Sequence, residues 1–170
     1  MQIQTNRLDI RPGISQDADD LFAIRNDDAI LRYNCMKKVS FEIWEEEVLF
    51  GKDLYFLYER EKKRAIGCIQ FQKDSLRYQT KTLEIAYWLD PKFWKQGYMK
   101  EGLEGMISYL FSIGYVGITA RAFADNKDSI KILESIGFVK EGELKDAVVA
   151  YNGILYDDCL FYLANNKEKI

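Results

Sequence analysis

The apolar residues between positions 82 and 110 change their period within one continuous stretch, and this change limits the possible folds more than any other feature. In residues 82–89 the odd-numbered side chains are large and apolar, whereas Glu84 lies among the even-numbered ones. Such alternation predicts a β-strand. In residues 99–110 the apolar side chains recur every three or four positions, which predicts an α-helix with one buried face. A strand joined by a short loop to an amphipathic helix favours an α/β fold.

The rest of the chain extends this pattern to a sheet of about seven strands. Together with 82–89, strands are predicted at residues 7–11, 54–58, 65–71, 116–124, 138–149 and 154–163. Ser15, Ser40 and Asn126 are suitable N-caps for three further helices, and Gly137 is a suitable stop for the last of them. This order of elements predicts a mixed sheet flanked by helices.

Length and composition favour one folded domain over residues 1–170. A chain of 170 residues can bury about 70% of its unfolded surface, so it needs no disulfide or metal for stability. The formal net charge of −3 argues against nucleic acid as a partner, because phosphate binding needs a cationic face. There is no signal peptide and no run of about 18 apolar residues, so we expect a cytoplasmic protein without membrane contact.

Histidine is absent, which excludes Ser-His-Asp and Cys-His catalysis and every histidine-based metal site. The three cysteines, Cys35, Cys68 and Cys159, are far apart in sequence and form no C-x-x-C pair. We therefore expect inert thiols and no metal site.

Residues 90–98 form the loop between the central strand and the helix. A helix N-terminus has unpaired backbone N–H groups and a positive dipole, and Gly97 allows a ligand to approach the backbone closely. Lys95 and Lys100 add positive charge. The chain has neither G-x-G-x-x-G nor G-x-x-x-x-G-K-[ST], so a dinucleotide fold or a P-loop is not supported. On these residues alone, the loop is either a structural turn or an anion site.

Three stretches of the chain together resemble the GNAT superfamily of N-acetyltransferases, in particular its ribosomal-protein N-terminal (Rim-type) branch. They are Thr5–Pro12, then Glu84–Leu89 continued by Phe93–Glu101, and finally Asn126–Phe138. The resemblance implies a single-domain GNAT-like α/β fold with a mixed, mostly antiparallel sheet that is splayed in the middle and binds acetyl-CoA. It also implies a homodimer as a family-level expectation.

The resemblance assigns the coenzyme site. The family's pyrophosphate loop, Q/R-x-x-G-x-G/A, corresponds to Trp94–Met99 in this sequence, namely Trp94, Lys95, Gln96, Gly97, Tyr98 and Met99, with Lys100 adjacent. Trp94 and Met99 depart from the pattern; the larger Met99 fits if its side chain points into the core. By the same analogy, the backbone of Tyr87 and Leu89 pairs with the pantetheine arm like an added strand. Asn126 matches a coenzyme-contacting asparagine, and an N-cap alone would also explain it.

Acetyl transfer requires an amine to lose a proton and to displace a thiolate. Glu84 matches a strand carboxylate of the branch and is the expected base; the alternative is a solvent-facing strand residue. Many GNAT enzymes place a tyrosine in the late helix to protonate the thiolate, but Leu133 occupies that position here. The donor is then Ser129 or water.

The expected function is transfer of an acetyl group to a primary amine, either a protein N-terminus or a small amine, by direct attack in a ternary complex. The acidic runs at 45–47 and 157–158 either face a cationic acceptor or are solvated surface. Two other functions stay open at this point. One is a non-catalytic acyl-CoA sensor on the same fold, and the other is an α/β binding domain without coenzyme.

Overall fold

The computed structural model describes residues 1–165, so the last five residues of the expected domain lie outside the described residues. The first part of the chain contains β1 (Ile3–Gln4), β2 (Leu8–Arg11), α1 (Ser15–Arg25), α2 (Asp28–Leu31), α3 (Phe41–Phe50), β3 (Leu54–Glu59), β4 (Arg64–Lys73) and β5 (Thr82–Leu89). A 3-10 turn (Pro91–Phe93) then leads to α4 (Tyr98–Ser112), β6 (Gly117–Phe123), α5 (Lys127–Ile136), β7 (Val139–Val149) and β8 (Leu155–Ala164).

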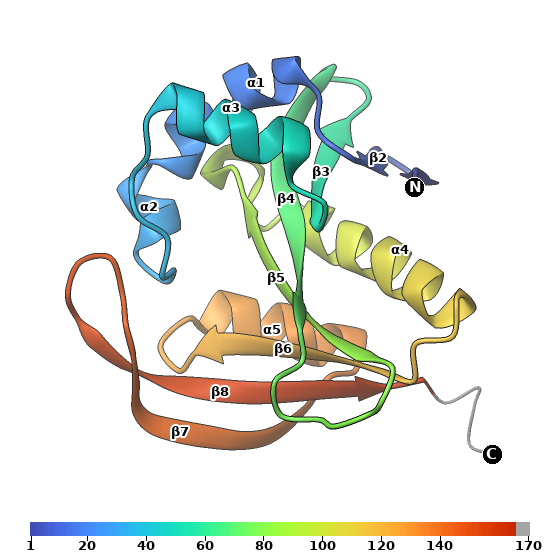
Figure 1. Ribbon diagram of the computed structural model, residues 1–170, viewed down its shortest axis with the longest axis vertical. Coiled ribbons are helices and arrows are strands. Elements are labelled where there is room, and N and C mark those ends of the chain that lie inside the picture. Colours follow the sequence, from blue (N-terminus) through green and yellow to red (C-terminus); the bar gives the residue numbers. More distant parts are fainter. Residues whose placement is uncertain (166–170) are drawn as a thin grey trace.

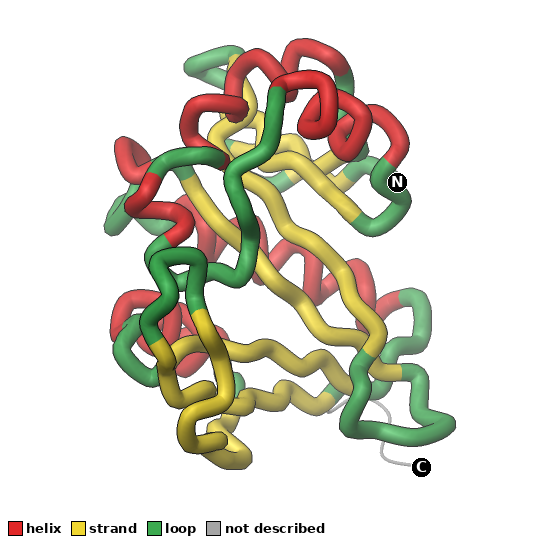
Figure 2. Tube along the Cα trace, turned by 60° about the vertical axis from the view of Figure 1, so that its left-hand side comes forward, coloured by secondary structure: helices red, strands yellow, loops and turns green. Residues whose placement is uncertain are grey.

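The described strands form one eight-stranded sheet in the order β1-β2-β3-β4-β5-β6-β8-β7. Every neighbouring pair is antiparallel except β5 and β6, which run parallel. The β5–β6 register ends at Ile85–Ala120, so residues 86–89 of β5 have no partner on the β6 side. The sheet therefore opens in its middle. Figure 1 shows β3–β5 running steeply and β6–β8 nearly at right angles to them, and the same divergence is visible in Figure 2.

Two layers of helices cover the sheet. On one face, α4 buries Met99, Leu103 and Met106 in a large core with the odd-numbered residues of β5, and Leu133 of α5 joins the same core. On the other face α1 and α3 pack over a smaller core around Trp44. The period-two pattern of β5 and the period-3.6 pattern of α4 both reflect this packing. Alternate strand residues face opposite helix layers, and one face of the helix faces the sheet.

The sheet has one strand more than the seven expected from the sequence. The additional strand is β1, whose two residues pair with Ile10 and Asp9 of β2. The short helix α2 was also not predicted. The expected N-cap of α1 was wrong by one residue, because Ile14 occupies that position and Asp17 accepts a hydrogen bond from the Ile14 N–H at 2.9 Å.

Candidate active site

A cavity of about 550 Å³ lies where β5 leaves β6. Its wall combines the end of β5, the loop and first turn of α4, the first turns of α5, and the region of α2. The residues that line it are Ala29, Ile30, Arg32, Tyr33, Asn34, Tyr87, Trp88, Leu89, Phe93, Trp94, Lys95, Gly97, Tyr98, Met99, Lys100, Asn126, Asp128, Ser129, Lys131 and Ile132.

The loop before α4 has the backbone geometry of an anion site. Gly97 is the N-cap of α4 with φ 81°, and Lys95 also has a positive φ, at 59°. No side chain caps α4. Its first N–H groups have no partner within the helix, and together with the helix dipole they attract negative charge. Lys95 and Lys100 line the same part of the cavity. The geometry therefore favours the anion site over a simple turn.

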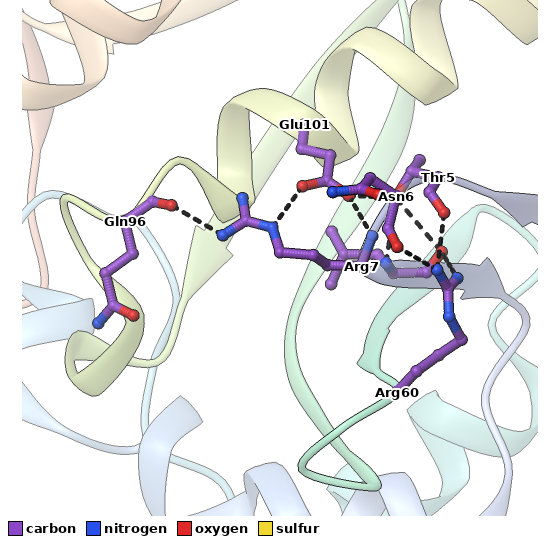
Figure 3. A network of polar contacts seen from close by, with 7 residues as sticks. Thr5, Asn6, Arg7, Arg60, Gln96 and Glu101 are labelled. Atoms are coloured by element: carbon purple, nitrogen blue, oxygen red, sulfur yellow. Dashed lines mark hydrogen bonds and ion pairs between the residues drawn. The ribbon is translucent and has the colours of Figure 1, made fainter.

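Arg7 holds this loop from outside the cavity (Figure 3). Its guanidinium donates to the Gln96 carbonyl at 3.0 Å, pairs with the Glu101 carboxylate at 2.7 Å, and lies 3.9 Å from the centre of the Tyr98 ring. Glu101 also accepts hydrogen bonds from the Thr5 hydroxyl and the Arg7 N–H. Burial raises the pKa of the Glu101 carboxyl, but these hydrogen bonds more than offset it, and the pKa lies below its ordinary value. The turn between β1 and β2 thus fixes the loop in place.

The open edge of β5 faces the cavity. The Asp90 N–H bonds to the Ile66 carbonyl of β4 at 2.7 Å. Backbone groups alternate sides along a strand, so those of Tyr87 and Leu89 point away from β4 toward the gap. The Trp94 indole donates to the Leu89 carbonyl at 2.7 Å and ties the loop to the strand end. The Tyr87 backbone and the Leu89 N–H remain on the open edge, where an extended ligand can pair with them.

The comparisons with known proteins agree with this geometry. The family model described as "Acetyltransferase (GNAT) domain" matches residues 7–139. The uncharacterized N-acetyltransferase YoaA of Bacillus subtilis (strain 168) is 30% identical, with 98% of each chain covered. The chain belongs to the GNAT acetyltransferase family.

Two other proteins similar to this acetyltransferase are named as ribosomal-protein acetyltransferases. The ribosomal-protein-serine acetyltransferase of Escherichia coli (strain K12) is 32% identical over 57% of this chain and 52% of that protein. The RimL ribosomal L7/L12 α-N-protein acetyltransferase, solved with coenzyme A, has a TM-score of 0.86 at 19% identity, covering 99% of this chain and 100% of that one. The family, the fold and the enzyme class are thus confirmed. The acyl donor is confirmed at the level of the family, because GNAT acetyltransferases use acetyl-CoA.

Nine of the ten residues predicted to bind the coenzyme line the cavity of the acetyltransferase. The exception is Gln96, whose side chain donates to the Lys92 carbonyl at 2.8 Å while its own carbonyl accepts from Arg7. The Met99 side chain is buried in the core, as the sequence required for a residue of that size. Leu133 is fully buried and brings no hydroxyl to the cavity.

Asn126 and Ser129 begin α5 on the cavity wall. The Asn126 side chain accepts a hydrogen bond from the Ser129 N–H at 3.2 Å, so it is an N-cap and a cavity residue at once. The Ser129 hydroxyl lies 2.8 Å from the Tyr87 hydroxyl. Sequence reasoning assigned only the backbone of Tyr87 and missed this contact.

Glu84 does not line the cavity. It stands three residues before Tyr87, so its side chain leaves β5 on the opposite face, where it borders a much smaller pocket with Arg121. Burial raises the pKa of the Glu84 carboxyl, with help from Asp74 and Asp158, although Arg121 acts in the other direction. A carboxyl with a raised pKa is closer to the protonation balance that a general base needs.

None of the three cysteines combines an exposed sulfur with a lowered pKa. Cys68 and Cys159 are buried, and burial raises the pKa of the Cys68 thiol. Cys35 is exposed, and partial burial of its sulfur together with the nearby Asp158 raises its pKa as well. Among residues 1–165, no group of three or more cysteine or acidic side chains is placed to hold a metal ion, and no helix is long and apolar enough to cross a membrane.

Proposed function

We propose that this acetyltransferase moves an acetyl group from acetyl-CoA to a primary amine by direct attack in a ternary complex. One observation carries the proposal: a single cavity combines an uncapped helix N-terminus with an open strand edge. These are the two backbone features that suit a pyrophosphate followed by an extended amide-bearing arm.

The residues of the cavity fit acetyl-CoA. The N–H groups that follow Gly97 bind the pyrophosphate, with Lys95 and Lys100 adding charge, and the backbone of Tyr87 and Leu89 pairs with the pantetheine amides. When bound, acetyl-CoA supplies an acyl group activated as a thioester. The side chain of Asn126 retains its amide N–H₂ for the coenzyme, because only its oxygen is used in the cap.

Glu84 accepts the proton of the amine through water, and Ser129 donates a hydrogen bond to the departing sulfur. Glu84 and Tyr87 are three residues apart, about 10 Å along a strand, which favours a relay over direct contact. Ser129 lines the cavity and stands one helical turn before Leu133, which is buried and carries no hydroxyl.

We place protein N-terminal amines first among the acceptors and small amines second, because two of the similar proteins are named as ribosomal-protein acetyltransferases. Such an acceptor places the reaction in the cytoplasm. The acidic runs do not favour either class, since Glu47 pairs with Arg25, Asp157 with Lys145, and the buried Asp158 with Arg121. The homodimer stays a prediction.

The proposal is tested by calorimetric titration with acetyl-CoA, followed by a panel of peptides and small amines read by thiol release. Binding at micromolar to millimolar concentration and acceptor-dependent release support it. Binding without release for any amine would instead identify an acyl-CoA sensor. No binding at millimolar acetyl-CoA would refute the assignment of the cavity.

Replacement of Glu84 by Gln tests the base. The variant keeps the shape and loses the charge, so kcat should fall about 10²–10⁴-fold, or roughly 3–5 kcal/mol, with acetyl-CoA affinity unchanged. Because the pKa of Glu84 is raised and only the ionised form accepts a proton, wild-type activity should decline as pH falls through that pKa. The pH–rate profile with an amine of known, high pKa is the measurement, and Glu61→Gln in the exposed β3–β4 turn is the control. Superimposable wild-type and Glu84→Gln profiles would leave Glu84 a strand residue only.

A further inference from the structure

Two hydroxyl groups from distant parts of the chain meet on the cavity wall. Tyr87 comes from β5, two residues beyond the last β5–β6 pair, and Ser129 comes from the first turn of α5. Their oxygens are 2.8 Å apart, and the phenol oxygen is also 3.5 Å from the Ser129 carbonyl. Neither residue is fully enclosed by protein, since both line the cavity. The contact therefore joins the open strand to the first turn of α5 at the place where a ligand would pass between them.

The surroundings decide which hydroxyl donates. If Ser129 donated to Tyr87, the phenol proton would have only the Ser129 carbonyl, at the limit of hydrogen-bond length. If Tyr87 donates, its proton has a good acceptor at 2.8 Å and the serine proton stays free. Burial raises the pKa of Tyr87 to about 12, an effect that the hydrogen bond with Ser129 partly opposes, so the phenol keeps its proton throughout the neutral range. The second arrangement gives the phenol proton the shorter hydrogen bond and leaves the serine proton available to a ligand in the cavity.

The rings of the other two tyrosines on the cavity wall make separate contacts. Arg7 lies over the Tyr98 ring, and Tyr33 packs edge-on against Phe123 and Tyr156. Among the residues that line the cavity, Ser129 and Tyr87 are the two hydroxyls that contact each other.

We propose that Tyr87 is a positioning residue, whose hydroxyl donates to Ser129 Oγ and thereby keeps the serine proton directed into the cavity, toward the sulfur of the acyl donor. This inference rests on the proposed function. In the transfer, the amine nitrogen forms its bond to the acyl carbon, the carbon–sulfur bond breaks, and its electron pair stays on sulfur. The amine proton goes to Glu84 through water, the Ser129 O–H stabilises the charge on sulfur, and the sulfur takes a proton from water as it leaves.

The test measures the affinity of coenzyme A, with its free thiol, by calorimetry across the pH range in which that thiol ionises. A hydrogen bond to the thiolate favours the charged form, so wild-type affinity should rise as the thiol loses its proton. In Tyr87→Phe this rise should shrink by up to about tenfold, because Ser129 is no longer held in position and its hydrogen bond to the charged sulfur is weakened. Ser129→Ala should also reduce the rise in coenzyme A affinity with pH. The double variant should reduce it no further than Ser129→Ala alone, because the two residues act as one unit. Ser129→Thr, which keeps a hydroxyl, should retain the rise in coenzyme A affinity with pH.

Acetyl-CoA is the internal control, because its sulfur cannot ionise, and its affinity should be the same in all variants. Tyr55→Phe on β3 is the matched control for the loss of a phenol, since Tyr55 packs on Phe71 and does not line the cavity. In turnover, Tyr87→Phe should lower kcat about tenfold with the KM for acetyl-CoA unchanged.

Additive effects of Tyr87→Phe and Ser129→Ala, or a Tyr87→Phe profile identical to that of wild type, would overturn the inference while acetyl-CoA binding still supported the proposed function. Loss of acetyl-CoA binding by the wild-type protein would instead overturn the function itself.

Discussion

Two helices begin on the wall of the same cavity, and their N-termini are built in opposite ways. At α5, the Asn126 side chain accepts a hydrogen bond from the Ser129 N–H, so the helix supplies its own cap. At α4, the N-cap is Gly97, which has no side chain, and no other side chain caps the helix. The α4 loop is instead fixed from behind by Arg7, and no side chain among residues 1–165 caps the first N–H groups of the helix.

The difference shows how to separate a structural helix start from a binding one. A capped terminus has used part of its hydrogen-bonding capacity and gains about 1 kcal/mol of stability. An uncapped terminus forgoes that gain and keeps its N–H groups and dipole for an anion. In this molecule the uncapped terminus is held from outside by Arg7, because an open loop must be held in position by something other than its own cap.

Gly97→Val should give the largest effect on coenzyme A affinity, because a branched side chain disfavours the left-handed backbone and shields the N–H groups. The affinity for coenzyme A should fall at least about tenfold, or roughly 1.4 kcal/mol. Gly137→Val is the matched control, since Gly137 has φ 106° at the other end of α5, where an added Cβ would meet only Leu163 at 3.7 Å. Equal affinities for both folded variants in a calorimetric titration would place the anion site elsewhere.

Arg7→Met should weaken coenzyme A binding several-fold, about the value of one or two hydrogen bonds, because the loop loses its contacts at Gln96 and Glu101 while the N–H groups themselves remain. Arg60→Met is the control. Arg60 donates to the carbonyls of Thr5, Asn6 and Leu8 in the same strand turn but does not contact the loop. Similar losses of affinity in both variants would show that general stability, not loop position, is affected.

Asn126→Ala should affect stability more than binding, with a loss of about 1 kcal/mol in the free energy of unfolding in urea. Ser40→Ala, which removes the cap of α3 far from the cavity, gives the reference for cap loss alone. Asn126→Asp keeps the cap and removes the amide N–H₂, so a loss of coenzyme A affinity in this variant would identify a direct contact. If only Asn126→Ala weakens binding, the residue acts through the helix.

The smallest effect concerns pH. The folded-state pKa of Glu101 is depressed, so its contribution to stability is present above the ordinary glutamate pKa and is lost as pH falls through the folded value. Glu101→Gln should therefore be less stable than wild type at neutral pH, and the difference should close in acid. Urea unfolding of both proteins at neutral and acidic pH tests this, and a gap that persists in acid would show that the carboxylate charge does not matter.

The sequence predicted the periodic elements well and the short ones poorly. Residues 82–89 and 99–110 carry enough alternating or helical positions to define a face, whereas β1 has two residues and α2 four, too few for any period. The position of Ser15 looked like a cap by residue type, but Asp17, three residues after Ile14, takes that role through its side chain.

For the site, local sequence motifs predicted the loop before α4, but they did not predict contacts between residues that are far apart in the sequence. Lys95, Gly97 and Lys100 were identified from one segment, because helix polarity and glycine geometry are local properties. Arg7 meets Gln96 across 89 positions, and no spacing rule connects them. The opposite faces of Glu84 and Tyr87 follow from the sequence, since their positions differ by an odd number. The separation of Glu84 from the cavity does not follow from this alone, because Trp88 shares the face of Glu84 and still lines the cavity.

The unpaired edge of β5 also raises the question of how an incomplete sheet avoids pairing with another sheet. An exposed strand edge is a template for pairing with other chains, and β7 at the outer edge carries Lys140, Glu141, Glu143 and Lys145, which discourage such pairing. The edge at residues 86–89 needs no charges, because α2, α4 and α5 surround the cavity that it faces. A narrow, flexible molecule can enter there, whereas a second sheet cannot. The surrounding helices thus protect the edge of β5 from pairing with another sheet, as the charged side chains protect the edge of β7. The edge of β5 can therefore remain apolar and available for a small ligand.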